Sequence, residues 1–327
     1  MIITKTPFRI SFAGGGSDIE DFYKLHEGCV LSTSINKYMY ISVHPYFDKA
    51  LTALKYSQNE IVSDYSEIKH RILKSVLTDM QIKGVEIVST ADIPSGTGLG
   101  SSSSFTVGLL NALNCYQGRS LSKQQLAEGA CDVEIQKLGS PIGKQDQYAA
   151  AFGGLNFITF RRNGEVQVEP LVIRNEVIND LQDNLIMLYT GVRHNANTIL
   201  AEQKKQIGQV DKTNNLLRMC ELAKEMRVSL ENESLDTFGQ ILDEGWRRKR
   251  ELASSISDNY IDDLYECAIK NGAVGGKLLG AGGGGFFLFY CEKEKQKQLK
   301  EALQLEEFSF RFEQSGSSVI YYGGPLC

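Results

Sequence analysis

The sequence predicts a folded α/β (α+β) protein with two domains, and three observations support this. The chain has 327 residues, of which 42% are apolar and 23% charged, a composition typical of globular proteins and unlike disordered, collagen-like or coiled-coil chains. Its length corresponds to about two domains of ordinary size. Segments with the two-residue alternation of strands are interspersed with segments that have the three- and four-residue spacing of helices.

The predicted elements follow one another in a clear order. Strand-like alternation is found at 39–43, 85–88 and 155–160. Helical patterns occupy most of 195–271, where apolar residues recur every three or four positions. Strand patterns return at 285–291 and 319–322, on either side of a helix-like segment at 292–303. The chain contains no internal repeat and no low-complexity stretch.

Charge and cysteine content exclude several classes of protein. The 35 Lys and Arg against 40 Asp and Glu give a net charge of −5, so we expect no nucleic-acid partner. No run of 18 apolar residues is present, so we expect no membrane span. Lys5 and Arg9 make the first residues unlike a secretory signal. The 7 cysteines are scattered without a CxxC pair, which favours a reduced, cytoplasmic protein without a structural zinc site.

Glycine residues gather in three clusters. Glycine permits positive φ angles and lets a ligand approach the main chain closely. One cluster is ordinarily a turn, but three beside periodic segments suggest a composite anion-binding site. The clusters are Gly14-Gly15-Gly16-Ser17-Asp18, the stretch from Pro94 to Ser104, and Gly280 to Gly285.

The second cluster lies between a strand pattern at 85–88 and an amphipathic helix pattern at 105–116. It therefore predicts a glycine loop that opens into a helix through four serines. The start of such a helix offers free N–H groups and the positive end of the helix dipole, which suit a phosphate group. Alternatively the segment is a flexible Gly/Ser linker, although a linker does not usually run directly into a helical stripe.

Three other glycine-loop classes are excluded by context. A Walker A loop needs a lysine after the last glycine, and none follows Gly100. The protein-kinase loop requires HRD and DFG segments, which the chain lacks. Gly280, Gly282 and Gly285 fit the GxGxxG pattern, but they precede a predicted strand, whereas a dinucleotide-binding turn opens a helix.

Carboxylates are the remaining candidates for chemistry. Ser122 and Gln125 form a capping-box pattern for a helix to about Leu138, and Glu134 interrupts its apolar row. A buried acid needs a cation or metal partner; the alternative is that the helix end leaves Glu134 in solvent. Asp146 follows in a polar GKQDQ segment, where it could instead be a helix N-cap.

These motifs resemble the GHMP kinases, a family that includes galactokinase, homoserine kinase and mevalonate kinase. The segment PSGTGLGSSSS is similar to the most specific signature of the family, and GAGGGG is similar to its third motif. Within the family, TPFRISFAGGGSD and GKQDQYAAAFGG look most similar to sugar kinases acting on D-glycero-D-manno-heptose 7-phosphate, with fucokinases nearby. Galactokinases carry a GEHTD-type first motif, so galactose is not the expected substrate.

The resemblance implies a fold and two domains. An N-terminal α/β domain at 1–180 would contain the phosphate loop and the catalytic aspartate. A C-terminal ferredoxin-like domain at 181–327 would complete an active site between the two. ATP and Mg²⁺ would be the cofactors, and the oligomeric state stays open, with a homodimer as one option.

The resemblance also implies roles for residues around the phosphates. Asp146 would accept the proton of the attacking hydroxyl, or mainly position it, and Arg9 would stabilise charge near the reacting phosphate; otherwise Arg9 is a surface arginine. Ser102 and Glu134 would hold the magnesium ion. The nucleotide phosphates would lie against Pro94, Ser95, Gly96, Thr97, Gly98, Leu99, Gly100, Ser101, Ser102 and Ser103.

On the acceptor side, Asp18 would bind sugar hydroxyls together with Gly14, Gly15, Gly16 and Ser17. The alternative for Asp18 is a helix N-cap. A phosphorylated sugar needs cations, for which Lys144, Arg193 and His194 are candidates. Gly282 and Gly283 would close the cleft. No adenine-contacting residue can be assigned from the sequence.

The expected function is therefore ATP-dependent phosphorylation of the anomeric hydroxyl of a heptose 7-phosphate. The sequence is also compatible with three alternatives. The first is a kinase of fucose or an N-acetylhexosamine. The second is a non-catalytic sugar sensor on the same fold, and the third is a decarboxylase of a phosphorylated acid.

Overall fold

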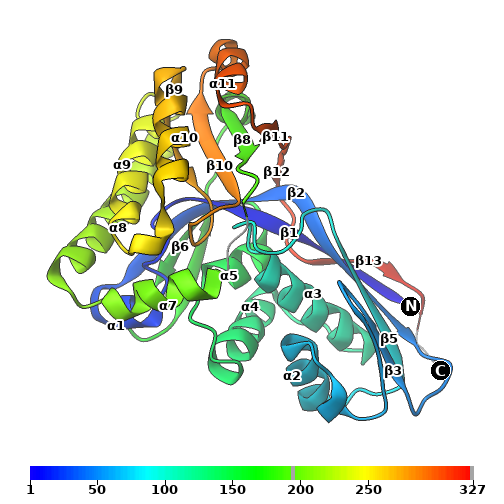
Figure 1. Cartoon of the computed structure of the whole chain (residues 1–327). Coiled ribbons are helices and arrows are strands. Elements are labelled where there is room, and N and C mark those ends of the chain that lie inside the picture. Colours follow the sequence, from blue (N-terminus) through cyan, green and yellow to red (C-terminus); the bar gives the residue numbers. More distant parts are fainter. Residues whose placement is uncertain (193–195, 325–327) are drawn as a thin grey trace.

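The computed structural model describes residues 1–192 and 196–324, which form two β-sheets covered by helices (Figure 1). The strands are β1 (Ile2–Ala13), β2 (Gly28–Pro45), β3 (Thr52–Lys55), β4 (Asn59–Val62), β5 (Val85–Ala91), β6 (Leu155–Phe160), β7 (Val166–Pro170), β8 (Leu185–Tyr189), β9 (Ala273–Leu278), β10 (Phe286–Cys291), β11 (Glu306–Glu307), β12 (Phe312–Glu313) and β13 (Ser318–Tyr322).

The α-helices are α1 (Glu20–His26), α2 (Arg71–Met80), α3 (Ser101–Tyr116), α4 (Lys123–Cys131), α5 (Gln145–Phe152), α6 (Asn175–Asp183), α7 (Ala196–Gln206), α8 (Val210–Glu231), α9 (Phe238–Arg250), α10 (Asn259–Lys270) and α11 (Gln296–Leu303). A π-helix, η2 (Asp132–Lys137), continues α4. Short 3-10 turns are η1 (Tyr65–Glu67), η3 (Ser254–Ile256) and η4 (Lys293–Lys295).

The first sheet has nine strands and is built on the long antiparallel pair β1 and β2. Helix α3 packs against both strands, and α4 and α5 pack beside it (Figure 1). Because side chains alternate along a strand, Arg9 and Ser11 of β1 share one face and both reach the pocket described below. The predicted strands at 39–43, 85–88 and 155–160 lie within β2, β5 and β6.

The second sheet has the strand order β11-β8-β10-β9 with antiparallel neighbours. Numbered along the chain, this is the order 4-1-3-2 of a ferredoxin-like βαββαβ unit, so the predicted fold class is confirmed. Helices α7 to α10 are inserted between β8 and β9, and α9 packs on β9.

The end of the chain returns to the first sheet, where β12 pairs with β2 and β13 pairs with β1. The second sheet begins at Leu185, close to the expected domain boundary. The division into 1–180 and 181–327 stays a prediction, and the final strands belong to the sheet of the N-terminal part.

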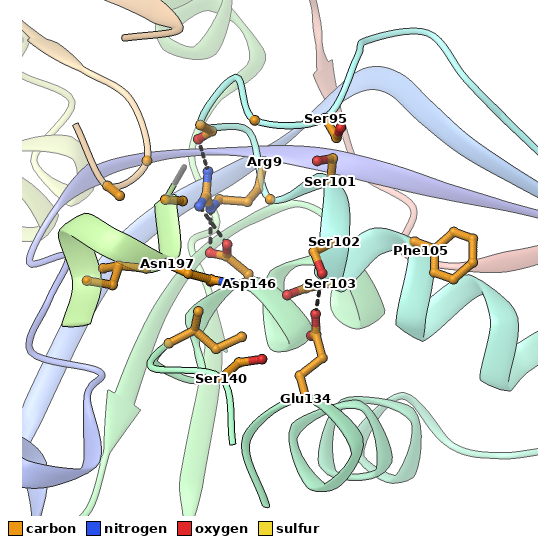
Figure 2. Close-up of a pocket in the computed structure, with 18 of the residues that line it drawn as sticks. Arg9, Ser95, Ser101, Ser102, Ser103, Phe105, Glu134, Ser140, Asp146 and Asn197 are labelled. Atoms are coloured by element: carbon orange, nitrogen blue, oxygen red, sulfur yellow. Dashed lines mark hydrogen bonds and ion pairs between the residues drawn. The ribbon is translucent and has the colours of Figure 1, made fainter. Parts of the chain in front are cut away.

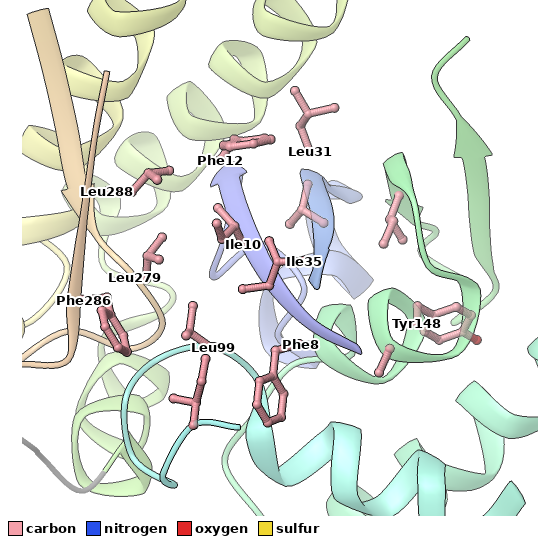
Figure 3. Packing of buried hydrophobic residues seen from close by; sticks show 14 of the residues in the cluster. Phe8, Ile10, Phe12, Leu31, Ile35, Leu99, Tyr148, Leu279, Phe286 and Leu288 are labelled. Atoms are coloured by element: carbon pink, nitrogen blue, oxygen red, sulfur yellow. The ribbon is translucent and has the colours of Figure 1, made fainter. Parts of the chain in front are cut away.

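Apolar side chains from both sheets meet in one core (Figure 3). Phe8, Ile10 and Phe12 from β1 are at most 2% exposed. Leu99 of the glycine loop and Leu279, which precedes the third glycine cluster, are each 1% exposed. Both glycine segments are therefore anchored in the core by a leucine, and this burial holds them beside each other.

None of the helices in the described residues is both long and apolar enough to cross a membrane. The cysteines in this part of the chain are free thiols: Cys29, Cys115, Cys131, Cys220, Cys267 and Cys291.

Candidate active site

A pocket of about 830 Å³ lies where the three glycine clusters meet. Its walls come from β1, the second glycine cluster, α5, α9 and β9, which are distant in sequence. Most of the predicted phosphate loop faces this pocket, through Pro94, Ser95, Gly96, Gly98, Gly100, Ser101, Ser102 and Ser103. Thr97 and Leu99 are buried at 1% exposure and are not among its lining residues.

The second and third glycine clusters touch through their main chains. A Cβ atom on Gly98 would lie 2.4 Å from the carbonyl oxygen of Leu279, and one on Gly280 would lie 2.3 Å from Gly98 Cα. Both glycines also have positive φ angles, +86° and +71°. Side chains at these positions would push the two segments apart, so glycine is required to close the pocket.

The loop opens directly into α3. Gly100 occupies the N-cap with φ 77°, and no side chain caps this helix end within the described part of the chain. Ser101, Ser102 and Ser103 form the first turn and line the pocket. The N–H groups of a first helical turn have no intrahelical acceptor, so this end can receive an anionic ligand. The linker interpretation of this segment is wrong.

Asp146 and Arg9 form a bidentate ion pair at this pocket (Figure 2). Arg9 Nε and Nη2 donate to the two carboxylate oxygens of Asp146 at 2.7 Å each, and Nη1 donates to the Gly98 carbonyl oxygen at 2.7 Å. Asp146 lies inside α5, whose N-cap is Lys144, so it is not a helix cap. Arg9 is 4% exposed, which excludes a surface role.

The carboxylate of Asp146 lies against the glycine loop at 96–103. A Cβ atom on Gly100 would be 3.3 Å from Asp146 Oδ2 and 3.3 Å from Arg9 Cγ. The loop, the cation and the carboxylate therefore face one another within contact distance, as transfer of a group from a bound anion to a hydroxyl requires.

Glu134 lies on the π-helix η2, where its side chain is 2% exposed. Ser102 Oγ donates to Glu134 Oε1 at 2.6 Å (Figure 2), and Gln147 Nε2 donates to Oε2 at 2.8 Å. Burial raises the pKa of Glu134, and the hydrogen bonds from Ser102 and Gln147 oppose that rise. The alternative of a solvated Glu134 is wrong.

This buried acid and hydroxyl fit a magnesium ion. The described residues contain no group of three or more His, Cys, Asp and Glu side chains arranged for a metal. Magnesium, however, usually binds through one or two carboxylates together with substrate phosphates and waters. Ser102 and Glu134 both line the pocket beside the glycine loop, so they can complete such a set.

Asp18 is buried beside the same pocket at 2% exposure. It accepts hydrogen bonds from Gly16 N at 2.9 Å, Gln145 N at 3.2 Å and Gln145 Nε2 at 3.3 Å. Helix α1 begins after an Ile19 N-cap, so Asp18 is not the cap of that helix. Burial, and then the charge of Asp146, raise the pKa of Asp18.

Two further polar atoms of this region are buried without a partner among the described residues, Ser11 Oγ and Gln145 Oε1. Both residues line the pocket with Gly15, Gly16 and Asp18. Unpaired buried polar atoms are costly, so a ligand with several hydroxyl groups would satisfy them. Ser17, by contrast, donates to the Gly14 and Cys29 carbonyl oxygens at 2.7 and 3.0 Å and so braces the loop.

The raised pKa of Asp18 makes stability depend on pH. Above the ordinary aspartate pKa the unfolded chain releases the proton while the folded protein retains it, so stability falls as the pH rises through the folded-state pKa. We expect the free energy of unfolding of Asp18→Asn, minus that of wild type, to rise between pH 4 and pH 8, as measured by thermal melts at each pH. A difference of one pH unit between the folded and unfolded pKa of Asp18 corresponds to about 1.4 kcal/mol. Asp21→Asn, at an exposed site on α1, is the control. A constant or falling difference would contradict the raised pKa.

Not all predicted site residues come to this pocket. Lys144 Nζ donates to the Gly164 carbonyl oxygen at 2.9 Å and lies 5.0 Å from the centre of the Tyr23 ring, and Lys144 is not a lining residue. Gly282 and Gly283 lie against Ile256, while Gly280 and Ala281 reach the pocket instead. Arg193 and His194 lie outside the described residues.

Two groups among the lining residues that no sequence motif indicated can contact a ligand through charge or an aromatic ring. Lys249 and Lys277 are buried cations from α9 and β9. At the other end of the pocket, the ring of His70 lies 4.8 Å from that of Tyr56 and 5.0 Å from that of Phe105. This apolar, aromatic end suits a planar base. Lys277, three residues before Gly280 of the third glycine cluster, was a signal for the first group. The second group comes from separate segments without a motif.

Comparison with known proteins identifies the family. Residues 66–154 match the GHMP kinases N terminal domain, and 226–308 match GHMP kinases C terminal. The chain is 31% identical over 318 residues to a Campylobacter jejuni D-glycero-alpha-D-manno-heptose 7-phosphate kinase, covering 94% of both chains. It is 29% identical to an Arabidopsis thaliana bifunctional fucokinase/GDP-fucose pyrophosphorylase, covering 91% of this chain and 30% of that one.

A solved structure supports the same assignment at the level of the fold. A D-glycero-D-manno-heptose 1-phosphate kinase from Bacteroides thetaiotaomicron has a TM-score of 0.80 at 23% identity, covering 99% of this chain and 100% of that one. The two family matches and the full-length relative give the same assignment. The glycine loop and the buried ion pair are consistent with it. The chain belongs to the GHMP kinase family and is a phosphotransferase.

Proposed function

We propose that this kinase is an ATP- and Mg²⁺-dependent sugar kinase that phosphorylates the anomeric hydroxyl of D-glycero-D-manno-heptose 7-phosphate. The product would be the 1,7-bisphosphate, on the route to a nucleotide-activated heptose for surface glycans. The ion pair of Asp146 and Arg9 against the glycine loop carries the proposal. The similarity to the Campylobacter jejuni heptose kinase supports the choice of sugar.

In this proposal the phosphate loop holds the nucleotide. The free N–H groups at the start of α3 receive the phosphates. The aromatic end of the pocket around His70 receives the adenine. Ser102 and Glu134 hold the magnesium ion, which when bound neutralises charge on the phosphates.

The acceptor side positions the hydroxyl. Asp18, Ser11 and Gln145 bind sugar hydroxyls, and Asp146 accepts the proton of the attacking anomeric oxygen. Arg9 fixes the orientation of Asp146 through two of its five N–H groups and donates a third to the Gly98 carbonyl oxygen. Its remaining two can stabilise charge on the transferred phosphoryl group.

A coupled ADP-release assay tests the proposal. The acceptors are D-glycero-D-manno-heptose 7-phosphate, the same heptose without phosphate, L-fucose, N-acetylgalactosamine and galactose, each with Mg²⁺ and after its removal by EDTA. We expect the highest kcat/KM with the heptose phosphate, no turnover of galactose, and background rates after EDTA and in Asp146→Ala. The proposal would be overturned if the wild type released no ADP with any of the acceptors, or if Asp146→Ala were fully active. Preference for L-fucose would favour the fucokinase alternative, which the Arabidopsis relative keeps open.

A further inference from the structure

Two buried lysines of the C-terminal half face the pocket from adjacent elements. Lys249 of α9 is 7% exposed and Lys277 of β9 is 6% exposed, and both are lining residues. Lys249 Nζ donates to the carbonyl oxygens of Leu278 at 3.1 Å and Gly280 at 2.5 Å. Lys277 Nζ donates to the carbonyl oxygen of Phe12 at 3.0 Å. These contacts hold both ammonium groups at the junction of the two sheets.

Neither ammonium group has an acidic partner in residues 1–192 or 196–324; the charged neighbours acting on them are other cations. Burial, together with the charge of Arg9, lowers the pKa of Lys277 to about 7. Burial, and then the charges of Lys277 and Arg9, lower the pKa of Lys249 well below its ordinary value. Buried charges without counterions are costly, so the ligand-free pocket is poised to take up an anion.

The other charged groups of the pocket already have assignments. Arg9 is paired with Asp146, and the nucleotide phosphates have the loop N–H groups, the start of α3 and the magnesium site. The two lysines remain. A bound phosphate monoester dianion would provide the missing counterion and favour the protonated form of both amines, whose two positive charges then match it. Each ammonium group has three N–H donors. Among the described residues, one donor of Lys249 and two donors of Lys277 have no acceptor and can bind a ligand. A phosphate monoester offers three terminal oxygens to these donors.

The position of the two lysines favours binding of the phosphate ester of the acceptor over binding of the nucleotide phosphates. Lys277 is bonded to Phe12, which neighbours Ser11 of the proposed sugar site, and Lys249 reaches Gly280 of the third glycine cluster. We propose that Lys277 and Lys249 bind the phosphate ester at the far end of the acceptor. This inference rests on the proposed function, and it replaces Lys144, whose ammonium group is bonded to Gly164 away from the pocket.

Comparison of two acceptors tests the inference. Steady-state kinetics and calorimetric binding are measured with D-glycero-D-manno-heptose 7-phosphate and with the same heptose without phosphate. The proteins are wild type, Lys277→Met, Lys249→Met and Lys144→Met, with Lys297→Met at an exposed site on α11 as the control. Methionine keeps the length of the side chain and removes the charge, and melting temperatures establish that each variant is folded.

We expect Lys277→Met to raise the KM for the phosphorylated heptose about 10- to 100-fold, the size of a lost charged hydrogen bond. The KM for the unphosphorylated heptose should change less than about 3-fold, and Lys249→Met should act in the same direction. Equal losses on both acceptors would mean that the lysines serve the transferred phosphoryl group, and a phosphate-specific loss in Lys144→Met would assign the site there. Either result overturns the inference.

Calorimetric binding to the wild type tests the inference without relying on the variants or on catalytic turnover. The inference predicts that wild type binds the phosphorylated heptose at least about 10-fold more tightly than the unphosphorylated one. Equal affinities would overturn it even if a variant failed to fold. A wild type that turns over none of the acceptors would contradict the proposed function alone, because the difference in binding would still be measured.

Discussion

Replacing Asp146 by asparagine is expected to lower kcat by about 10²- to 10⁴-fold, the usual contribution of a positioned general base. Asparagine keeps the shape of the side chain but loses the charge that pairs with Arg9 and the ability to accept a proton. The KM values for ATP and for the sugar should change much less, because the loop and the proposed hydroxyl-binding residues remain. Steady-state kinetics with the preferred acceptor measure the effect.

The control for this variant is Asp132→Asn, since Asp132 lies on the nearby π-helix with its side chain 50% exposed and pairs with Lys137 at the surface. It should retain wild-type kcat. If Asp146→Asn also retained kcat within about 3-fold, phosphoryl transfer would not need this carboxylate, and the catalytic assignment would be wrong.

Replacing Gly98 by alanine is the second change with a large expected effect. The new Cβ would lie 2.4 Å from the Leu279 carbonyl oxygen, at a φ of +86°. An alanine in this conformation costs about 1–2 kcal/mol, and the clash adds to that cost by forcing the two glycine clusters apart. We expect a lower melting temperature and a kcat/KM for ATP reduced by at least about 10-fold, since a displacement of about 1 Å can cost 10²-fold in rate.

Gly139→Ala is the matched control, because Gly139 also has a positive φ of +63°, but an added Cβ would have no atom of the described residues within 4 Å beyond its own chain neighbours. It shares the backbone cost without the clash. Calorimetry and ATP kinetics on the two variants therefore isolate the contact between the clusters. Equal losses of stability in both, with ATP kinetics unchanged in both, would show that this contact does not shape the pocket.

Local patterns made much of this structure predictable. The strand at 85–88, the serine-rich helix start and the capping box at Ser122 depend on neighbouring residues, and β5, α3 and α4 confirm them. The sequence leaves both a buried and a solvated Glu134 possible, because the π-helix shifts the side-chain spacing after Cys131. A regular helical wheel cannot show that shift.

The missed cations were hidden by their sequence context. Lys249 lies in the run Arg247 to Arg250, which looks like a solvated basic helix end, and only the packing of α9 on β9 buries this one member. Lys144 stood in a motif and looked more promising, yet its ammonium group turns to Gly164. Which cation of a sequence faces a pocket depends on long-range packing, which local periodicity does not encode.

In the proposed mechanism the loop at 96–103 holds the nucleotide phosphates while Asp146 faces the acceptor hydroxyl. A crystal structure of Asp146→Asn with a non-hydrolysable ATP analogue, Mg²⁺ and heptose 7-phosphate tests it most directly. We expect the β- and γ-phosphates on the N–H groups at the start of α3, and the anomeric oxygen within hydrogen-bonding distance of residue 146. A triphosphate bound elsewhere, or an anomeric oxygen pointing away from residue 146 in the closed pocket, would contradict it.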